Sequence, residues 1–236
     1  MKTIGFLVQG ELGISLAVWA IKEKKYDKHI VFCRRDVRDA FKSLENVALV
    51  DSEEDIYKHE PNVIFSLGYW KIIKKQYVDK FRIINLHHSY NLTYRGRHMC
   101  SWAILNARKH NLWVHGTTFH EMGEKLDSGN IIYSEQVPIY EGDTSYSLFL
   151  RCDKIAERIW KDNYKAMIQG KYETYEVPIG QFHYKERDLK HRVDLNMLDV
   201  DICDSVRALT FPDKRKPYAI VNGHVIELIL KDGVAT

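Results

Sequence analysis

The chain has 236 residues, 45% of them hydrophobic and 28% charged, which is the composition of an ordinary folded protein. Its 35 basic residues nearly balance 32 acidic ones, and the net charge of +3 disfavours a protein that binds DNA or RNA through overall charge. The wide spacing of the four cysteines disfavours a metal cluster or a disulfide framework. No apolar run suits a membrane span or a signal peptide. We therefore expect a cytoplasmic protein without a nucleic-acid or membrane partner.

The first part of the chain alternates predicted strands with predicted helices. A β-rich run at residues 3–8 leads through a turn containing Gly10 and Gly13 into an amphipathic helix at 14–24. Further strands are expected at 29–33, 47–50, 62–66 and 82–85, with helices at 37–44 and 72–77. This alternation predicts an α/β fold with a Rossmann-like, mostly parallel sheet, in which ligands bind beyond the carboxyl ends of the strands.

The pattern changes in the second part of the chain. Two β-rich runs at 113–120 and 130–139 flank a long loop, and Thr144 is expected to cap a helix that ends at Gly170. After a polar stretch follow a predicted helix at 202–209 and strands at 218–221 and 224–230. We therefore expect a catalytic domain at 1–180 and a small C-terminal α+β subdomain at 181–236.

Four polar side chains lie near the predicted strand ends, namely Asn85, His87, His120 and Asp127. Because side chains alternate along a strand, Asn85 and His87 are expected on one side, whereas His87 and His88 could not share an ion. An amide and a protonated imidazole can stabilise an oxyanion, and a carboxylate such as Asp127 would orient the ring. A histidine that is merely hydrogen-bonded, or a metal site of His87, His120 and Asp127, stay open as alternatives.

Basic residues at 95–98 precede a predicted helix at 99–108. Arg95, Arg97 and His98 would suit a phosphate at the helix start, although a solvated loop fits the spacing equally well. The turn with Gly10 and Gly13 lacks the glycine spacing of a dinucleotide fingerprint, so a nicotinamide cofactor is rejected.

Taken in order, these motifs resemble the formyltransferase family that uses N10-formyltetrahydrofolate. The resemblance is carried by NLHHSYNLTYRG at 85–96, WAILN at 102–106, GTTFHEM at 116–122 and LDSGNII at 126–132. The family pattern has prolines where this chain has His88 and Leu92, and leucines where it has Tyr90 and Asn91. We expect these departures beside the acceptor pocket to tune substrate choice.

The resemblance implies a site without a metal and with N10-formyltetrahydrofolate as co-substrate. It implies that Asn85, His87 and Asp127 are catalytic: the first two stabilise the tetrahedral oxyanion, and Asp127 holds His87 and helps remove the proton from the attacking amine. The residues it implies for folate binding are Ser66, Gly68, Tyr69, His120, Met122 and Asp127.

Chain length, the 94–97 loop and the small C-terminal tail look most like the nucleotide-sugar branch of the family, rather than the methionyl-tRNA or purine-synthesis branch. The expected acceptor is a nucleotide-linked amino sugar, a 4-amino-4,6-dideoxyhexose used for surface polysaccharide, and a homodimer is expected by analogy. The expected substrate-binding residues are Gln9, Gly10, Tyr94, Arg95, Arg97 and Tyr184, with Trp102 as a further stacking candidate. Alternatives are a non-catalytic folate or nucleotide-sugar binder and a formyltransferase for another small amine.

Overall fold

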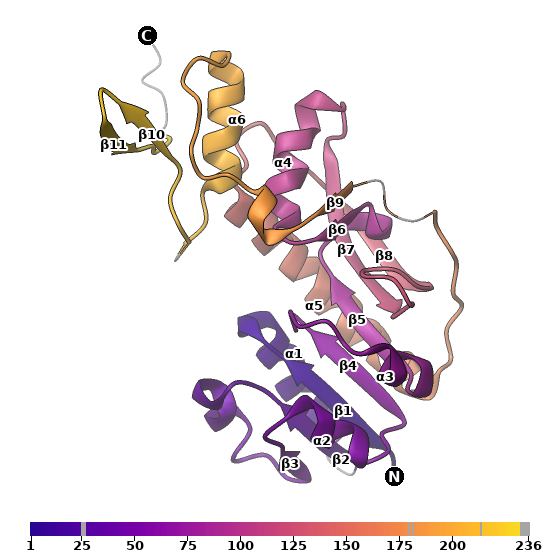
Figure 1. Ribbon diagram of the computed structural model, residues 1–236. Helices are drawn as coiled ribbons and strands as arrows, with labels where there is room; N and C mark the ends of the chain where they lie inside the picture. The colour runs from indigo at the N-terminus through magenta and orange to yellow at the C-terminus, as the bar shows by residue number, and fades with distance from the viewer. Residues whose placement is uncertain (25–26, 179, 181, 213, 232–236) are drawn as a thin grey trace.

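The computed structural model describes residues 1–24, 27–178, 180, 182–212 and 214–231 (Figure 1). A seven-stranded sheet has the strand order β3-β2-β1-β4-β5-β7-β8. Its strands are β1 (Thr3–Val8), β2 (Lys28–Phe32), β3 (Val47–Leu49), β4 (Val63–Leu67), β5 (Ile83–His87), β7 (Val114–Glu121) and β8 (Ile131–Pro138). Pairing is parallel from β3 to β5 and antiparallel for β5–β7 and β7–β8, so the predicted mostly parallel α/β sheet is confirmed.

Two long helices, α1 (Gly10–Glu23) and α5 (Ser145–Gln169), cover one face of the sheet and bury the main core. Trp160 lies at its centre, with its ring edge-on to Phe65 at 4.8 Å between centroids and its indole N–H donating to the carbonyl of Leu16. A side chain at Gly13 would place Cβ 2.4 Å from the carbonyl oxygen of Leu67, so glycine lets α1 lie directly against β4.

The long helix begins and ends where its sequence predicts. The Thr144 hydroxyl accepts a hydrogen bond from the N–H of Ser147, and Gly170 adopts a left-handed conformation (φ 68°) just past the last turn. No helix in the described ranges combines the length and apolar composition needed to cross a bilayer.

The opposite face carries two short helices, α2 (Glu53–Lys58) and α3 (Lys75–Lys80), over a smaller core. Sequence analysis missed α2, although Ser52 and Asp55 form a capping box at its start. The helix predicted at 72–77 begins instead at Lys75, because the side chain of Ile73 is buried in this core ahead of it.

The helix predicted at 37–44 is also wrong: the segment forms the 3₁₀ helix η1 (Arg35–Ala40). Buried Phe41 ends it, since the chain has to return to the start of β3 within a few residues. The first helix starts at Gly10 rather than residue 14, so the expected turn after β1 is already helical.

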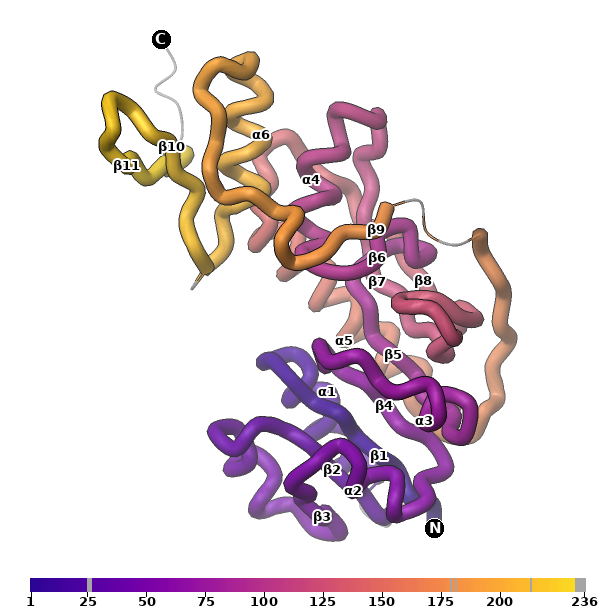
Figure 2. The backbone as a smooth tube through the Cα atoms, viewed as in Figure 1, coloured from indigo at the N-terminus to yellow at the C-terminus, as the bar shows by residue number. Residues whose placement is uncertain are grey.

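A further layer packs beside β7. It contains α4 (Met99–Lys109), α6 (Asp199–Leu209), the 3₁₀ turns η2 (Tyr90–Leu92) and η3 (Glu186–Asp188), and a two-stranded parallel sheet of β6 (Tyr94–Gly96) and β9 (Phe182–Tyr184) that the sequence did not reveal. Figure 2 shows the chain after α5 passing β8 before β9 reaches β6, and Tyr175 pairs with Ile131 on the way.

The C-terminal part of the chain packs on the rest through α6. Val206 and Leu209 share a core with Trp102 and Leu105 of α4, whereas the hairpin of β10 (Tyr218–Val221) and β11 (His224–Glu227) projects away (Figure 1). The expected boundary falls between residue 180 and residue 181, and the latter lies outside the described residues.

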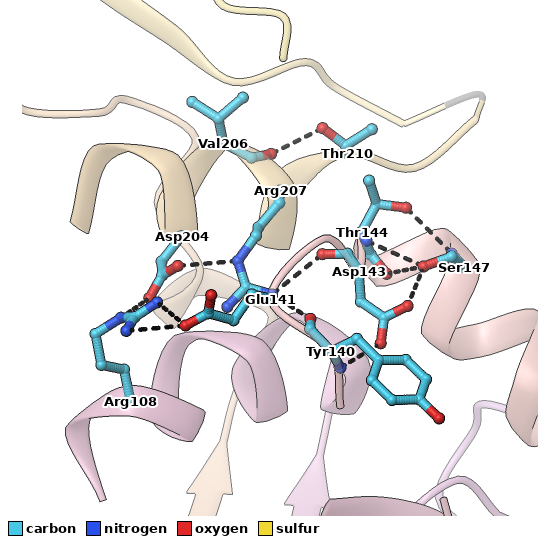
Figure 3. A network of polar contacts seen from close by, with 10 residues as sticks. All are labelled: Arg108, Tyr140, Glu141, Asp143, Thr144, Ser147, Asp204, Val206, Arg207 and Thr210. Atoms are coloured by element: carbon cyan, nitrogen blue, oxygen red, sulfur yellow. Dashed lines mark hydrogen bonds and ion pairs between the residues drawn. The ribbon is translucent and has the colours of Figure 1, made fainter. Parts of the chain in front are cut away.

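A polar network fixes α6 to α4 and to the turn before α5 (Figure 3). The Arg207 side chain is 3% exposed; its Nε donates to Asp204 at 2.9 Å and its Nη1 to the carbonyls of Tyr140 and Asp143. Arg108 of α4 contacts the second oxygen of Asp204 at 3.1 Å. A buried guanidinium with this many partners makes the position of α6 specific.

We predict that Arg207→Met lowers the free energy of unfolding by about 3 to 5 kcal/mol, since it leaves Asp204 buried with only Arg108 and removes the donors from two carbonyls. Urea unfolding measures this loss. Arg158→Met is the matched control: it removes an ion pair with Glu135 whose side chains are 52% and 39% exposed, and should cost at most about 1 kcal/mol. Equal losses in both variants would contradict the role given to Arg207.

Candidate active site

Strand β5 carries the two central side chains of the site. Asn85 and His87 point to the face that holds α2 and α3, whereas Leu86 and His88 point to the α5 face, so the predicted alternation is confirmed. Asn85 is 8% exposed and His87 6% exposed. Both side chains are therefore largely removed from water. In this less polar environment their hydrogen bonds are stronger than they would be in water.

His87 is held by two contacts. Its Nε2 lies 2.8 Å from the carbonyl oxygen of Tyr94, which can only accept, so Nε2 carries a proton. Its Nδ1 lies 3.7 Å from Oδ1 of Asp127. That approach to a carboxylate is favourable when Nδ1 also carries a proton.

Asp127 is brought to His87 by the loop between β7 and β8. The loop is closed by hydrogen bonds from Glu121 N to Asn130 O (2.8 Å) and from Gly123 N to Ser128 O (2.7 Å). Gly129 has φ +123°, and a side chain there would meet the carbonyl of Glu121 at 1.9 Å.

The tip of this loop is tied to β6. Oδ2 of Asp127 accepts from the N–H of Gly96 at 2.7 Å, and Nε of Arg95 donates to the carbonyl of Leu126 at 2.8 Å. The carboxylate therefore has one oxygen anchored to β6 and the other directed at His87.

His120 orients Asn85 from the neighbouring strand. Its Nδ1 donates to the carbonyl of Glu121, which leaves Nε2 to accept from the amide nitrogen of Asn85 at 3.1 Å. Burial, followed by the charge of His87, lowers the pKa of His120 to about 4, so the ring is neutral. One N–H of the Asn85 amide is thereby used, and the second has no acceptor among the residues that the structure describes.

The alternative of a metal site at His87, His120 and Asp127 loses its support. Both ring nitrogens of His120 are already hydrogen-bonded, and Nε2 of His87 is committed to Tyr94. Over the described residues, these three side chains do not gather their ligand atoms into a coordinating group.

The residues expected to bind folate lie at the ends of β4 and β7. Gln9 N donates to the carbonyl of Leu67, which brings the start of α1 beside Gly68 and Tyr69. The Tyr69 hydroxyl donates to Glu53, and Ser66 and Met122 are buried and half-buried. Tyr69 and Met122 pack on the same core as Ile83 of β5, and the role of all these residues in folate binding stays a prediction.

The predicted contact of the Tyr94 ring with substrate is wrong. This ring is 1% exposed, stacked on Phe182 at 5.0 Å, so only the backbone carbonyl of Tyr94 serves the site. Trp102 is also unavailable on one face, because its ring stacks on Tyr184 at 3.8 Å.

Arg97 is half-exposed; its guanidinium lies over the ring of Trp70 at 5.2 Å, and its Nη1 lies 3.9 Å from Glu186. Trp70 is 52% exposed and was missed by sequence analysis; an exposed tryptophan directly after Gly68 and Tyr69 was the available signal. Gly10 lies exposed at the start of α1, and with Gln9 it remains a candidate only by position.

His88, which replaces a proline of the family pattern, ties β5 to α5. Nε2 donates to Asp153 at 2.7 Å, and Nδ1 lies 3.1 Å from the Thr117 hydroxyl. The same hydroxyl donates to the carbonyl of Cys152, so His88 and Thr117 together link β5, β7 and α5.

Comparison with known proteins gives a consistent result. A family model described as Formyl transferase matches residues 18–164. A curated GDP-perosamine N-formyltransferase of Brucella melitensis biotype 1 is 28% identical over 157 residues, which cover 65% of this chain and 58% of that protein. The chain spans about half the length of the curated formyltransferases of Brucella and Bacillus that it matches.

Solved structures share the fold over nearly the whole chain. A 4-N formyltransferase from Francisella tularensis superimposes with a TM-score of 0.84 over 99% of both chains at 20% identity. The N-formyltransferase from Helicobacter canadensis, solved in complex with folinic acid and dTDP-3-aminofucose, gives a TM-score of 0.75 over 94% of this chain and 85% of that chain at 21% identity.

We predict that His120 makes the fold less stable as the pH falls below about 6.5. The unfolded chain takes up a proton on His120 near pH 6.5 and the folded chain only near pH 4, so between these values the unfolded state binds more protons and the free energy of unfolding decreases, by up to about 1.4 kcal/mol per pH unit. Urea unfolding at pH 7 and pH 5 measures the decrease.

His120→Gln is the comparison variant, since its amide oxygen can accept from Asn85 at the position of Nε2 and does not titrate. Its loss between the two pH values should be smaller than that of the unaltered protein. His115, whose pKa burial lowers to about 3, contributes equally to both proteins. The same loss in both would show that His120 is not the titrating group.

Proposed function

The chain belongs to the formyl transferase family, and from this premise we propose that it transfers a formyl group from N10-formyltetrahydrofolate to the amine of a nucleotide-linked amino-dideoxy sugar. The observation that carries the proposal is the convergence of Asn85, His87 and Asp127 from two separate segments within one buried site. A relative that formylates GDP-perosamine supports the class of acceptor.

The proposed reaction is attack of the acceptor amine on the formyl carbon. The free N–H of Asn85 and Nδ1–H of His87 would donate to the oxyanion that develops on the formyl oxygen. Asp127, beside Nδ1, would take the proton that the amine loses as the new C–N bond forms. The bond between the formyl carbon and N10 then breaks, and tetrahydrofolate leaves with a proton on that nitrogen.

Donor and acceptor would approach from different sides of this trio. We place the folate beside the ends of β4 and β7, near Gly68, Tyr69 and Met122; the folinic acid bound by the Helicobacter canadensis protein supports this donor. Arg97 and the outer nitrogens of Arg95 are proposed to face the diphosphate, with Tyr184 and Trp70 next to them.

The 4-amine is proposed as the acceptor position, supported by the 4-N formyltransferase from Francisella tularensis. The product would serve surface polysaccharide synthesis. All four cysteines are free thiols, as in proteins of a reducing compartment, which supports a place in the cytoplasm.

We propose that the enzyme acts as a homodimer formed through residues 181–236, the expected C-terminal subdomain. The β10–β11 hairpin and the residues after it leave an apolar surface exposed, which a partner would cover. Its members are Ile220, Val221, Val225, Ile226, Ile229 and Leu230.

The first test of the function is an assay with formyl donor and a panel of dTDP-, UDP- and GDP-linked amino sugars, with products identified by mass. We expect one added formyl group on a 4-amino sugar. His87→Asn and Asp127→Asn should each lower kcat by on the order of 10² to 10⁴, because each removes a group that acts in proton transfer or oxyanion binding.

His59→Asn, an exposed change at the end of α2 ahead of the start of β4, should keep the full rate. Formylation of a different amine that still requires Asn85, His87 and Asp127 would contradict the proposed acceptor but not the proposed reaction. Folate binding without any product would favour the non-catalytic binder, and a full rate in His87→Asn would exclude the mechanism.

The dimer is tested by light scattering after size-exclusion chromatography. Val225 is 70% exposed, and Val225→Lys is predicted to convert a dimer of the unaltered protein to monomer, because the charge would have to be buried at the interface. Leu150→Lys, a similar change at a 40% exposed position on α5, should leave the dimer intact. A monomeric unaltered protein would exclude the proposal.

A further inference from the structure

Three metal-ligating side chains meet in the core behind the active site. Cys100 of α4, His115 of β7 and Cys152 of α5 offer ligand atoms that all lie within 4.8 Å of one another. The residues are 8%, 1% and 0% exposed. The expectation that the cysteines form no metal cluster was based on their wide spacing in the sequence. The fold brings Cys100 and Cys152 together despite that spacing.

Packing alone does not account for this cluster. Nε2 of His115 lies 3.6 Å from Sγ of Cys100, and Nδ1 has no hydrogen-bond partner within the described part of the chain. An unpartnered polar atom in the core is unfavourable unless another group satisfies the ring.

We propose that Cys100, His115 and Cys152 bind one zinc ion. Thiolate and imidazole are ligands that Zn²⁺ prefers, and three protein ligands leave a fourth position open. Charge favours this ion in a dry core: two thiols each lose a proton on binding, and the two thiolates then cancel the 2+ charge. A monovalent ion such as copper(I) on the same two thiolates would leave a net negative charge in the core.

The proposed ion would link α4 and α5 to β7, the strand that pairs with β5. The ring of Tyr94, whose carbonyl holds His87, lies edge-on to His115 at 5.7 Å. The Thr117 hydroxyl donates to the carbonyl of Cys152 and contacts His88. The metal would thus be structural, outside the formyl-transfer chemistry, and its presence does not depend on which amine the enzyme uses.

The test is the metal content of the full-length protein, expressed in medium with added zinc and purified without chelator. We expect one zinc per chain by mass spectrometry of the elements. Cys100→Ala and Cys152→Ala should reduce it to background, whereas Cys33→Ala, which removes a buried thiol outside the cluster, should retain it.

If Cys100→Ala or Cys152→Ala folds poorly, a second measurement tests the site without these variants. The unaltered protein refolded with Co²⁺ should show the near-ultraviolet thiolate-to-cobalt band, and Cys33→Ala should show the same band. A zinc-free protein with no such band would overturn the site, as would a Cys100–Cys152 disulfide in place of metal. Copper in place of zinc would overturn the identity of the ion.

Discussion

The hydrogen bond from Nε2 of His87 to the carbonyl of Tyr94 determines how the whole site is arranged. It fixes the protonated nitrogen, and so leaves Nδ1 as the atom that faces Asp127. The ring of Tyr94, packed on Phe182 and edge-on to His115, anchors the backbone that carries the accepting oxygen. The buried ring of Tyr94 thereby sets the direction of the His87 imidazole.

The same region is where the sheet changes from parallel to antiparallel pairing. Because β7 runs against β5, His120 stands opposite Asn85 in the register, and β7 ends beside Ile84 near the start of β5. The loop after β7 therefore has to turn back along β5 to bring Asp127 to His87, and the hydrogen bond from Gly96 N–H holds Asp127 there.

Local patterns in the sequence predicted the parts of the fold that local forces decide. The capped helix from Thr144 to Gly170 and the shared face of Asn85 and His87 both follow from short-range geometry. The β6–β9 pair, the burial of Tyr94 and the meeting of Cys100 with Cys152 could not be predicted, since each depends on segments brought together only by tertiary packing. The catalytic trio came from family resemblance, and its roles remain proposals.

The parallel pairing of β6 with β9 has a consequence for the order of events during synthesis. Tyr94 pairs with Phe182, so 88 residues separate the partners (182 − 94 = 88), and the closing segment follows the whole of α5. Contacts between such distant segments form late, after local structure has been ordered. A nascent chain that already contains Asn85 and His87 of β5 would lack the strand β9, which pairs with Arg95 and Gly96. The site around His87 would then be complete only after β9 has been synthesised. The seven-stranded sheet that carries His87 is already complete at the end of β8.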